Sequence, residues 1–296
     1  MPRGEAEPIT RWHVLLAGLT VCTTMLAGAS LDPLYSDLGP IALTGLALHH
    51  PSVFLAGLPF SLPLLFILGV HEMGHFVTAR WYGIRATWPY FLPGPPVFSL
   101  GTFGAFIRLK GAIPTRGALM DVGVGGPFWG FLASIAVAAS GFIAARAGYH
   151  APADLGMDVN LPLAYRGLQM LILGDSRGTL TFFENPVLLA AWLGLFIQGL
   201  NLLPVGQLDG GHVLYAFAKA RHRWVSTAIA VALLAYALVQ PQWIVWAALL
   251  FFVLGLRHPP TLYDDVPMTP RQVALGVAAA IIFVLCFLPA PFTSFS

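Results

Sequence analysis

Long stretches without charged side chains constrain the fold of this chain more than any other feature of its sequence. The run PSVFLAGLPFSLPLLFILGV, residues 51–70, contains no charged residue. Apolar segments cover residues 12–30, 53–82, 119–147, 186–203, 224–240, 242–256 and 272–289. Because a helix needs about 20 apolar residues to cross a bilayer, with a range of about 17–25, this pattern predicts an all-α polytopic membrane protein.

The composition agrees with a membrane protein and disfavours other classes. The chain is 57% hydrophobic and 9% charged, with a mean hydropathy of +0.76, whereas soluble domains are about 25% charged. A net charge of +2 gives no indication of a nucleic-acid partner. Cys22 and Cys286 lie in separate apolar segments and lack the spacing of a metal or redox motif.

The basic residues predict about seven transmembrane helices, with six to eight as the range, and a cytosolic N-terminus. With seven helices, the predicted cytosolic side holds Arg3, Arg11, Arg80, Arg85, Arg108, Lys110, Arg116, Lys219, Arg221, Arg223, Arg257 and Arg271. The other side holds Arg146, Arg166 and Arg177. The short apolar segment 39–50 is interpreted as re-entrant or interfacial, with an eighth helix as the alternative. Counting it as a span would move the basic residues of 80–116 and 219–223 outside.

An HExxH motif, His71-Glu72-Met73-Gly74-His75, ends the second apolar segment. On a helix both imidazoles lie on one face with a carboxylate beside them, as in zinc hydrolases. Burying these polar groups in lipid costs free energy, which indicates a function. At 1.5 Å per residue, the seven-helix topology places the histidines roughly 8–14 Å below the cytosolic edge, within reach of water.

The third ligand of a catalytic zinc is expected to come from a distant segment, because such a site takes three protein ligands and leaves one position for water. Asp209 in LNLLPVGQLDGGHVLYA follows an apolar segment at its predicted cytosolic end. Pro204 breaks the preceding helix, so this carboxylate can reach a neighbouring helix. His212 is the rival ligand, and Asn201 is expected to orient a bound peptide. Asp121 is interpreted as a helix cap, with a hydrogen bond to a zinc histidine as the alternative.

Between the two motifs lies a stretch of glycines and aromatic residues, GTFGAFIRLK at 101–110, preceded by prolines at 89, 93, 95 and 96. The prolines exclude a continuous helix, and the spacing predicts a β-hairpin over 88–112. A transmembrane substrate must unwind before cleavage, and an edge strand can pair with its freed backbone groups. We therefore expect the substrate-binding residues to be Gly101, Thr102, Phe103 and Gly104. The alternative is an amphipathic loop at the membrane interface.

GVHEMGH at 69–75 together with NLLPVGQLDGG at 201–211 closely resembles the site-2 protease family of intramembrane zinc metalloproteases. The segment at 89–119 resembles the branch of that family without a PDZ domain, and the resemblance extends from about residue 58 to 220. It implies one zinc ion per chain, bound by His71, His75 and Asp209, with Glu72 as the general base that activates water. It also implies that the hairpin, or a re-entrant segment in its place, is embedded in the membrane.

One part of the family pattern is missing. The stretch from Val124 to Gly130 contains the family's glycines and proline but has no asparagine close behind. Asn201 or a backbone group would then have to stabilise the oxyanion. By this comparison the chain divides into three parts. Residues 1–52 form an N-terminal span plus a re-entrant or interfacial segment, 53–223 the catalytic membrane core, and 224–296 the accessory spans.

These features predict an integral, multi-pass zinc metalloendopeptidase that cleaves transmembrane segments of single-span membrane proteins, with its active site open toward the cytosol. The alternative is a membrane metal transporter or a non-catalytic adaptor with a structural zinc site. Another class of HExxH membrane protease would need a later glutamate as third ligand. The only one, Glu184, lies on the predicted opposite side of the membrane.

Overall fold

The computed structural model describes residues 6–96, 100–147, 160–174, 185–240, 243–244, 255–256 and 258–291. Its helices are α1 (Arg11–Ala29), α2 (Pro40–His49), α3 (Ser52–Ala56), α4 (Leu58–Trp81), α6 (Arg116–Arg146), α7 (Leu163–Leu173), α8 (Pro186–Asn201), α9 (Asp209–Ala237) and α11 (Pro270–Cys286). Its strands are β1 (Arg85–Ala86), β2 (Tyr90–Pro93), β3 (Thr102–Phe106) and β4 (Leu109–Lys110).

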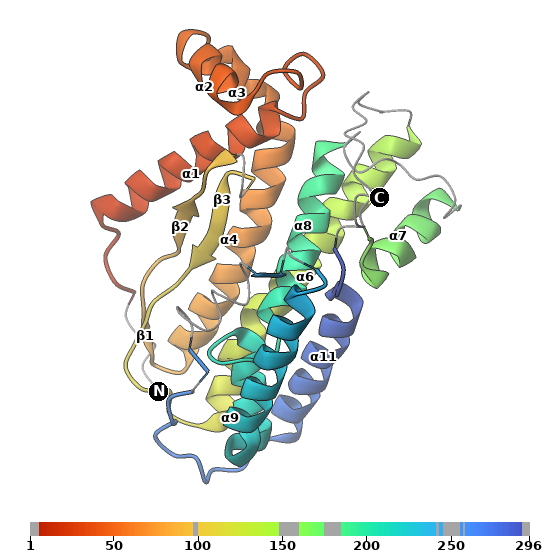
Figure 1. The fold of residues 1–296 in the computed structure, drawn as a ribbon. Coiled ribbons are helices and arrows are strands. Elements are labelled where there is room, and N and C mark those ends of the chain that lie inside the picture. Colours follow the sequence, from red (N-terminus) through yellow and green to blue (C-terminus); the bar gives the residue numbers. More distant parts are fainter. Residues whose placement is uncertain are drawn as a thin grey trace.

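Helix α6 occupies the centre of the fold and packs against α4, α7, α8, α9 and α11 (Figure 1). The apolar core lies between α4, α6 and α8, where Phe60, Ile67, Phe142, Trp192 and Leu195 are almost completely buried. Several other large apolar side chains of α4 and α6 are exposed. A membrane helix needs one face that packs against other helices and an apolar face that contacts lipid, and these helices have both.

Within the described part of the chain, three helices, α1, α4 and α6, are long and apolar enough to cross a membrane, and α2, α7, α8 and α11 are shorter apolar helices. The chain therefore has the character of a helical membrane protein, while the count of seven spans stays a prediction. Most of the segment 242–256 lies outside the described residues. Helix α2 has ten residues and rises about 15 Å, half of a hydrocarbon core of about 30 Å. Its length favours the re-entrant or interfacial interpretation of residues 39–50.

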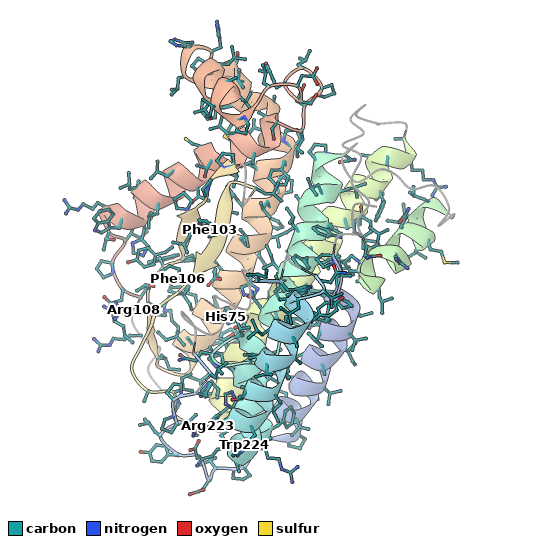
Figure 2. The ribbon with its side chains drawn as sticks, viewed as in Figure 1. His75, Phe103, Phe106, Arg108, Arg223 and Trp224 are labelled. Carbon is teal, nitrogen blue, oxygen red and sulfur yellow. The ribbon has the colours of Figure 1, made fainter. Side chains whose placement is uncertain are left out.

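Helix α9 reverses direction at Ala218, whose backbone angles, φ −137° and ψ 53°, are not helical. The hydroxyl of Ser226, in the second half of α9, accepts a hydrogen bond from the backbone N–H of Gly206, 3.1 Å away and just before the first half. A straight helix would separate Asp209 from Ser226 by about 25 Å. The second half therefore folds back beside the segment that precedes α9. Arg223 lies near this bend, at the end of the molecule opposite α2 and α3 (Figure 2).

The predicted hairpin segment contains two antiparallel strand pairs, β2–β3 and β1–β4. In the longer pair, Tyr90 lies opposite Phe106 and Leu92 opposite Gly104, with an irregularity between Leu92 and Pro93. Strand β2 lies on the side of α1 and β3 on the side of α4 (Figure 1). The strands thus have the pairing expected of a hairpin, whereas its position in the membrane stays a prediction.

The interpretation of Asp121 as a helix cap is wrong. Helix α6 is capped by Thr115, whose side chain accepts a hydrogen bond from the Ala118 N–H. Asp121 lies five residues inside α6, and its carboxylate accepts hydrogen bonds from Tyr82, Arg271 and Gln272. These bonds join the end of α4 and the start of α11 to α6, and none of them involves a histidine.

Candidate active site

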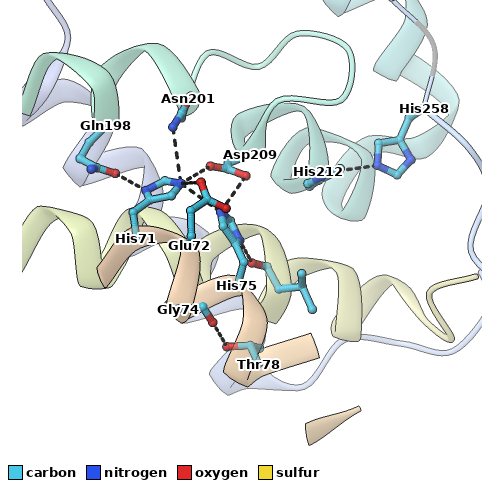
Figure 3. Close-up of polar contacts among 11 residues, drawn as sticks. His71, Glu72, Gly74, His75, Thr78, Gln198, Asn201, Asp209, His212 and His258 are labelled. Atoms are coloured by element: carbon cyan, nitrogen blue, oxygen red, sulfur yellow. Dashed lines mark hydrogen bonds and ion pairs between the residues drawn. The ribbon is translucent and has the colours of Figure 1, made fainter. Parts of the chain in front are cut away.

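The HExxH residues lie on the buried face of α4, one helical turn apart. His71, Glu72 and His75 are each less than 10% exposed. The helix that carries them begins at Leu58, has proline in its first turn and ends at Trp81. Because residues four apart share one face of a helix, the two imidazoles project together toward α6 and α8 (Figure 3). The histidines therefore meet where α4 crosses its two main neighbours.

Asp209 reaches this face from the first turn of α9. Its carboxylate oxygens lie 3.4 Å from His71 Nε2 and 3.3 Å from His75 Nε2. The two Nε2 atoms are 3.1 Å apart, and Glu72 Oε1 lies 3.9 Å from His71 Nε2. Among the described residues, His71, His75 and Asp209 are the one group of three or more His, Cys, Asp or Glu residues arranged to hold a metal ion. The aspartate expected from the sequence thus lies beside both histidines.

The spacing of these three donors fits a tetrahedral zinc site. Nitrogen and oxygen ligands lie about 2.0–2.1 Å from zinc, so the corners of a regular tetrahedron are about 3.3–3.4 Å apart. The three measured separations, 3.1, 3.3 and 3.4 Å, are close to this value. Two imidazole nitrogens and a carboxylate are also ligands that zinc accepts readily. The donor set and its dimensions therefore suit zinc.

Both histidines are oriented by hydrogen bonds through the other ring nitrogen. His71 Nδ1 lies 2.8 Å from Gln198 Oε1, and His75 Nδ1 lies 2.7 Å from the backbone carbonyl of Val122. Each acceptor requires a proton on Nδ1, which leaves a lone pair on Nε2. The neutral tautomers that a metal needs are thus selected by α8 for one histidine and by α6 for the other.

Close approach of α6 to α4 depends on glycine. A Cβ atom at Gly126 would lie 2.1 Å from His75 Nε2, and one at Gly74 would lie 2.3 Å from the carbonyl oxygen of Gly125. No side chain fits at either position without displacing a ligand or a helix. The glycines at 125 and 126 therefore let α6 pass directly behind His75.

Asn201 borders the cluster, because its Nδ2 lies 3.5 Å from His71 Nε2. His212, the rival ligand, is engaged elsewhere: its Nδ1 lies 2.6 Å from His258 Nε2 (Figure 3). The backbone amide of Ile107, directly after β3, lies within hydrogen-bonding reach of the Glu72 carboxylate. The hairpin therefore reaches the candidate general base through its backbone.

The four hairpin residues expected to bind substrate have different surroundings. The Gly101 carbonyl accepts a hydrogen bond from Thr23 on α1, and the Thr102 hydroxyl donates to the Leu92 carbonyl inside the hairpin. Phe103 is 67% exposed and projects from β3 (Figure 2). A Cβ atom at Gly104 would meet no atom within 4 Å. Gly101 and Thr102 thus hold the hairpin in place, and Phe103 and Gly104 form its open part.

Gln198, the Val122 carbonyl and Gly126 were not identified as site residues from the sequence. Gln198 had a detectable signal, since it is a polar residue in an apolar helix, three residues before Asn201. A backbone carbonyl has no signature in the sequence. The role of Gly126 depends on how two helices cross, which no local pattern reveals.

The fold and the cluster together define a helical membrane protein with the donor set of a zinc hydrolase. The sequence model of Peptidase family M50 matches residues 59–240, more than half of the chain. The chain therefore belongs to peptidase family M50, and the resemblance to site-2 proteases noted from its motifs is confirmed.

Named relatives agree with the family. The chain is 33% identical over 245 residues to the probable zinc metalloprotease EGY2, chloroplastic, of Arabidopsis thaliana, covering 80% of this chain and 42% of the relative. It is 29% identical over 308 residues to the probable zinc metalloprotease EGY1, chloroplastic, of the same plant, covering 96% of this chain and 55% of the relative. The chain thus spans about half the length of these curated relatives. No solved structure matches it.

Proposed function

We propose that this chain is an intramembrane zinc metalloprotease that cleaves transmembrane segments of membrane proteins. The observation that carries the proposal is the meeting of two buried imidazoles, a carboxylate and Glu72 at one point among apolar helices. Membership of family M50 and relatives named as probable zinc metalloproteases support it. The natural substrates are then single-span membrane proteins.

In this proposal His71, His75 and Asp209 hold one zinc ion per chain. Bound zinc would lower the pKa of water to about 7 and polarise the carbonyl group of the scissile peptide. Gln198 and the Val122 carbonyl hold the proton of each imidazole on Nδ1 and direct the two Nε2 atoms at one point. Burial of the two histidines and partial burial of Asp209 exclude most of the water that would compete for the site.

Glu72 acts as the general base and then as the general acid. It takes a proton from the attacking water and delivers it to the leaving amine, so that it ends the cycle ionised as it began. Its position beside His71, 3.9 Å from Nε2, places it next to the metal ligands without making it one of them. Asn201, at the other side of His71, is suited to donate a hydrogen bond to the oxyanion.

The edge of β3 is proposed to hold the unwound substrate. Strand β3 pairs with β2 along one edge, while its other side is turned toward α4, and Ile107 at its end reaches Glu72. A substrate strand added at this edge would place a peptide bond beside the general base. Exposed Phe103 and the open space at Gly104 leave room for its side chains.

The decisive experiment compares the native chain with Glu72→Gln, an isosteric change that removes the base. Both proteins are reconstituted in vesicles with a tagged single-span substrate, and bound zinc and cleavage are measured together. We expect one zinc per chain in both proteins and cleavage only by the native chain. Asp32→Asn, a change of an acid outside the cluster, is the matched control and should cleave normally.

The same variant identifies substrates. Glu72→Gln expressed in native membranes should retain uncleaved single-span proteins, which are then isolated with it and sequenced. Equal cleavage by Glu72→Gln and the native chain would contradict the role of Glu72. Zinc flux into sealed vesicles without any cleavage would favour the alternative of a metal transporter.

A further inference from the structure

Two hydrogen bonds between α4 and α6 end on neighbouring residues of α6. The Val122 carbonyl accepts one from His75 Nδ1, 2.7 Å away. The carboxylate of Asp121, the residue before it, accepts one from the Tyr82 hydroxyl. Tyr82 directly follows α4, seven residues after His75. The helix that carries two metal ligands is therefore joined to α6 at two adjacent positions, one at the candidate site and one beside it.

Asp121 also connects α6 to α11. Its Oδ2 atom accepts hydrogen bonds from Arg271 Nη2 at 2.6 Å and from Gln272 Nε2 at 3.2 Å, and both donors belong to the first turn of α11. The two helices are in close contact here, because a Cβ atom at Gly117 would lie 2.4 Å from Gln272 Oε1. One carboxylate thus fixes the position of this part of α6 relative to both α4 and α11.

The turn of α6 that follows Asp121 is poorly able to set its own geometry. Pro127 donates no N–H, so the carbonyl of Gly123 lacks the usual helical bond from the residue four positions later. Gly125 and Gly126 add backbone freedom, yet they cannot be replaced by larger residues, because both pack directly against α4. This turn of α6 therefore needs support from outside the helix.

Stability alone does not explain the buried carboxylate. The Asp121 side chain is 3% exposed, and its Oδ1 accepts no hydrogen bond from any residue that the structure describes. Burying a carboxylate oxygen without a donor costs free energy, and a buried ion pair is often no more stable than apolar residues of similar volume. Arg271 is 68% exposed, so water could solvate it without this bond. The pair therefore points to a role in geometry.

We propose that Asp121 is a positioning residue of the candidate metal site and that Arg271 of α11 assists it. By fixing α6 between α4 and α11, Asp121 holds the Val122 carbonyl where it accepts the Nδ1 proton of His75. The Nε2 lone pair of His75 is then directed at the other two ligands. The Asp121 side chain bonds no metal ligand and acts through the backbone. This inference rests on the proposed function, because it takes His75 as a zinc ligand.

The zinc affinity of the full chain, measured by competition with a chelator, is the first test. Asp121→Asn keeps the shape of the side chain but removes its charge, and it should weaken zinc binding about tenfold, as loss of a group that orients a ligand does. Arg271→Ala, a change at an exposed position, should cause a smaller loss, and Arg271→Lys should restore the native affinity. Arg221→Ala and Asp32→Asn change charges outside this network and are the matched controls.

Cobalt(II) in place of zinc reports the arrangement of the ligands, because its visible absorption depends on coordination geometry. If Asp121 positions His75, the bands of the cobalt-loaded Asp121→Asn chain should differ in wavelength or intensity from those of the native chain. Loss of a residue that only supports the fold would lower the unfolding temperature and leave the spectrum of the loaded chain unchanged.

The metal-free chain gives a readout that does not depend on zinc. The Nδ1 protons of His71 and His75 are each held by one acceptor, and the proton resonance of an imidazole N–H moves upfield when its hydrogen bond weakens. With ¹⁵N-labelled histidine, Asp121→Asn should move the His75 signal. The His71 signal should stay in place, because its acceptor, Gln198, belongs to α8. His71→Gln and His75→Gln assign the two signals.

Equal zinc affinities, equal cobalt spectra and an unmoved His75 signal in the native and Asp121→Asn chains would overturn the proposal. Equal movement of both histidine signals would overturn it too, because the effect would then be general rather than transmitted through Val122. Failure of the native chain to bind zinc would instead contradict the proposed function, while the His75 signal would still show whether Asp121 orients the imidazole.

Discussion

His71 and His75 are held through Nδ1 by different kinds of acceptor. The Val122 carbonyl belongs to the backbone of α6 and cannot be lost by mutation, whereas Gln198 is a side chain of α8. Gln198 is completely buried and its Nε2 finds no hydrogen-bond partner among the described residues. A buried amide that is only half satisfied is costly. The presence of Gln198 at this buried position is best explained by its one hydrogen bond, which orients His71.

Gln198→Ala should therefore weaken zinc binding about 10- to 100-fold, as loss of a group that orients a metal ligand typically does. Gln198→Glu, which restores an acceptor for the Nδ1 proton, should recover most of the affinity. Zinc affinity is measured by competition with a chelator of known strength. Gln169→Ala, a change of another buried glutamine on α7, is the control. Unchanged affinity in Gln198→Ala would show that Gln198 only fills space.

The proximity of His71, His75 and Asp209 could be expected from the sequence, but the groups that support them could not. HExxH suggests two candidate ligands and a candidate base because one helix places them together, and Asp209 stands out as an acid in a broken apolar segment. Gln198, the Val122 carbonyl and Gly126 act only because α8 and α6 cross α4 at this point. Their roles come from tertiary packing, which a single sequence does not express.

Strand β3 has two kinds of positions, because alternate residues of an antiparallel strand direct their backbone groups to opposite edges. The backbone groups of one set make hydrogen bonds to β2, and those of the other set point away from β2. Proline has no N–H, so single substitutions at Phe103, Ala105 and Phe106 separate the two sets. In the set facing away, cleavage should be lost while the fold and bound zinc are kept. In the other set, the unfolding temperature should also fall. Full cleavage in all three variants would exclude pairing of the substrate with β3.

The segment 258–264 is an element that the sequence analysis did not identify. It lies along the start of α6, with the N–H groups of Leu262 and Tyr263 donating to the carbonyls of Ile113 and Pro114. His258 begins this segment, bonds His212 and stacks on Tyr215, with ring centroids 4.4 Å apart. Lys219 binds Asp264 at its other end, 2.7 Å away. The segment thus joins α6 to both sides of the bend in α9.

Burial lowers the pKa of His258 from its ordinary value near 6.5 to about 4. In the docked state the segment 258–264 lies against α6 and α9. Because the pKa of His258 is lowered in this state, its contribution to the stability of docking is fully present above pH 6.5. That contribution is lost as the pH falls from 6.5 toward 4. We therefore expect hydrogen exchange at Leu262 and Tyr263, corrected for its intrinsic pH dependence, to accelerate between pH 7 and 5. His258→Gln should remove this pH dependence. If both proteins respond alike, another group controls the docking.

The elements themselves were partly foreseeable. Four prolines between residues 89 and 96 excluded a helix and indicated strands, which the structure contains as β2 and β3. The reversal at Ala218 was not predicted, because no proline or glycine marks it. It is supported from outside the helix, by the contact of Ser226 with Gly206. Long-range contacts of this kind decide where a helix turns when its own residues do not.

The predicted orientation in the membrane can be tested with two cysteine probes. After Cys22 and Cys286 are replaced by serine, Trp224→Cys and Met170→Cys introduce thiols at sites that are 78% and 65% exposed without changing a basic residue. A membrane-impermeant maleimide should label Cys at 224 only in inverted vesicles, and Cys at 170 only in right-side-out vesicles, because basic loops stay in the cytosol. The opposite pattern would invert the proposed topology and place the active site toward the other compartment.

The contact between Gly126 and His75 bears on how such a protein could change over evolution. A methyl group at residue 126 would overlap with His75 Nε2. Because the imidazole is more flexible than the helix backbone, it would rotate away while the two helices stay in place. HExxH and Asp209 would remain intact in such a chain, yet the site could no longer assemble. The difference between a working peptidase and a stable pseudoenzyme in this family can thus be one carbon atom, at a position that motif searches do not inspect.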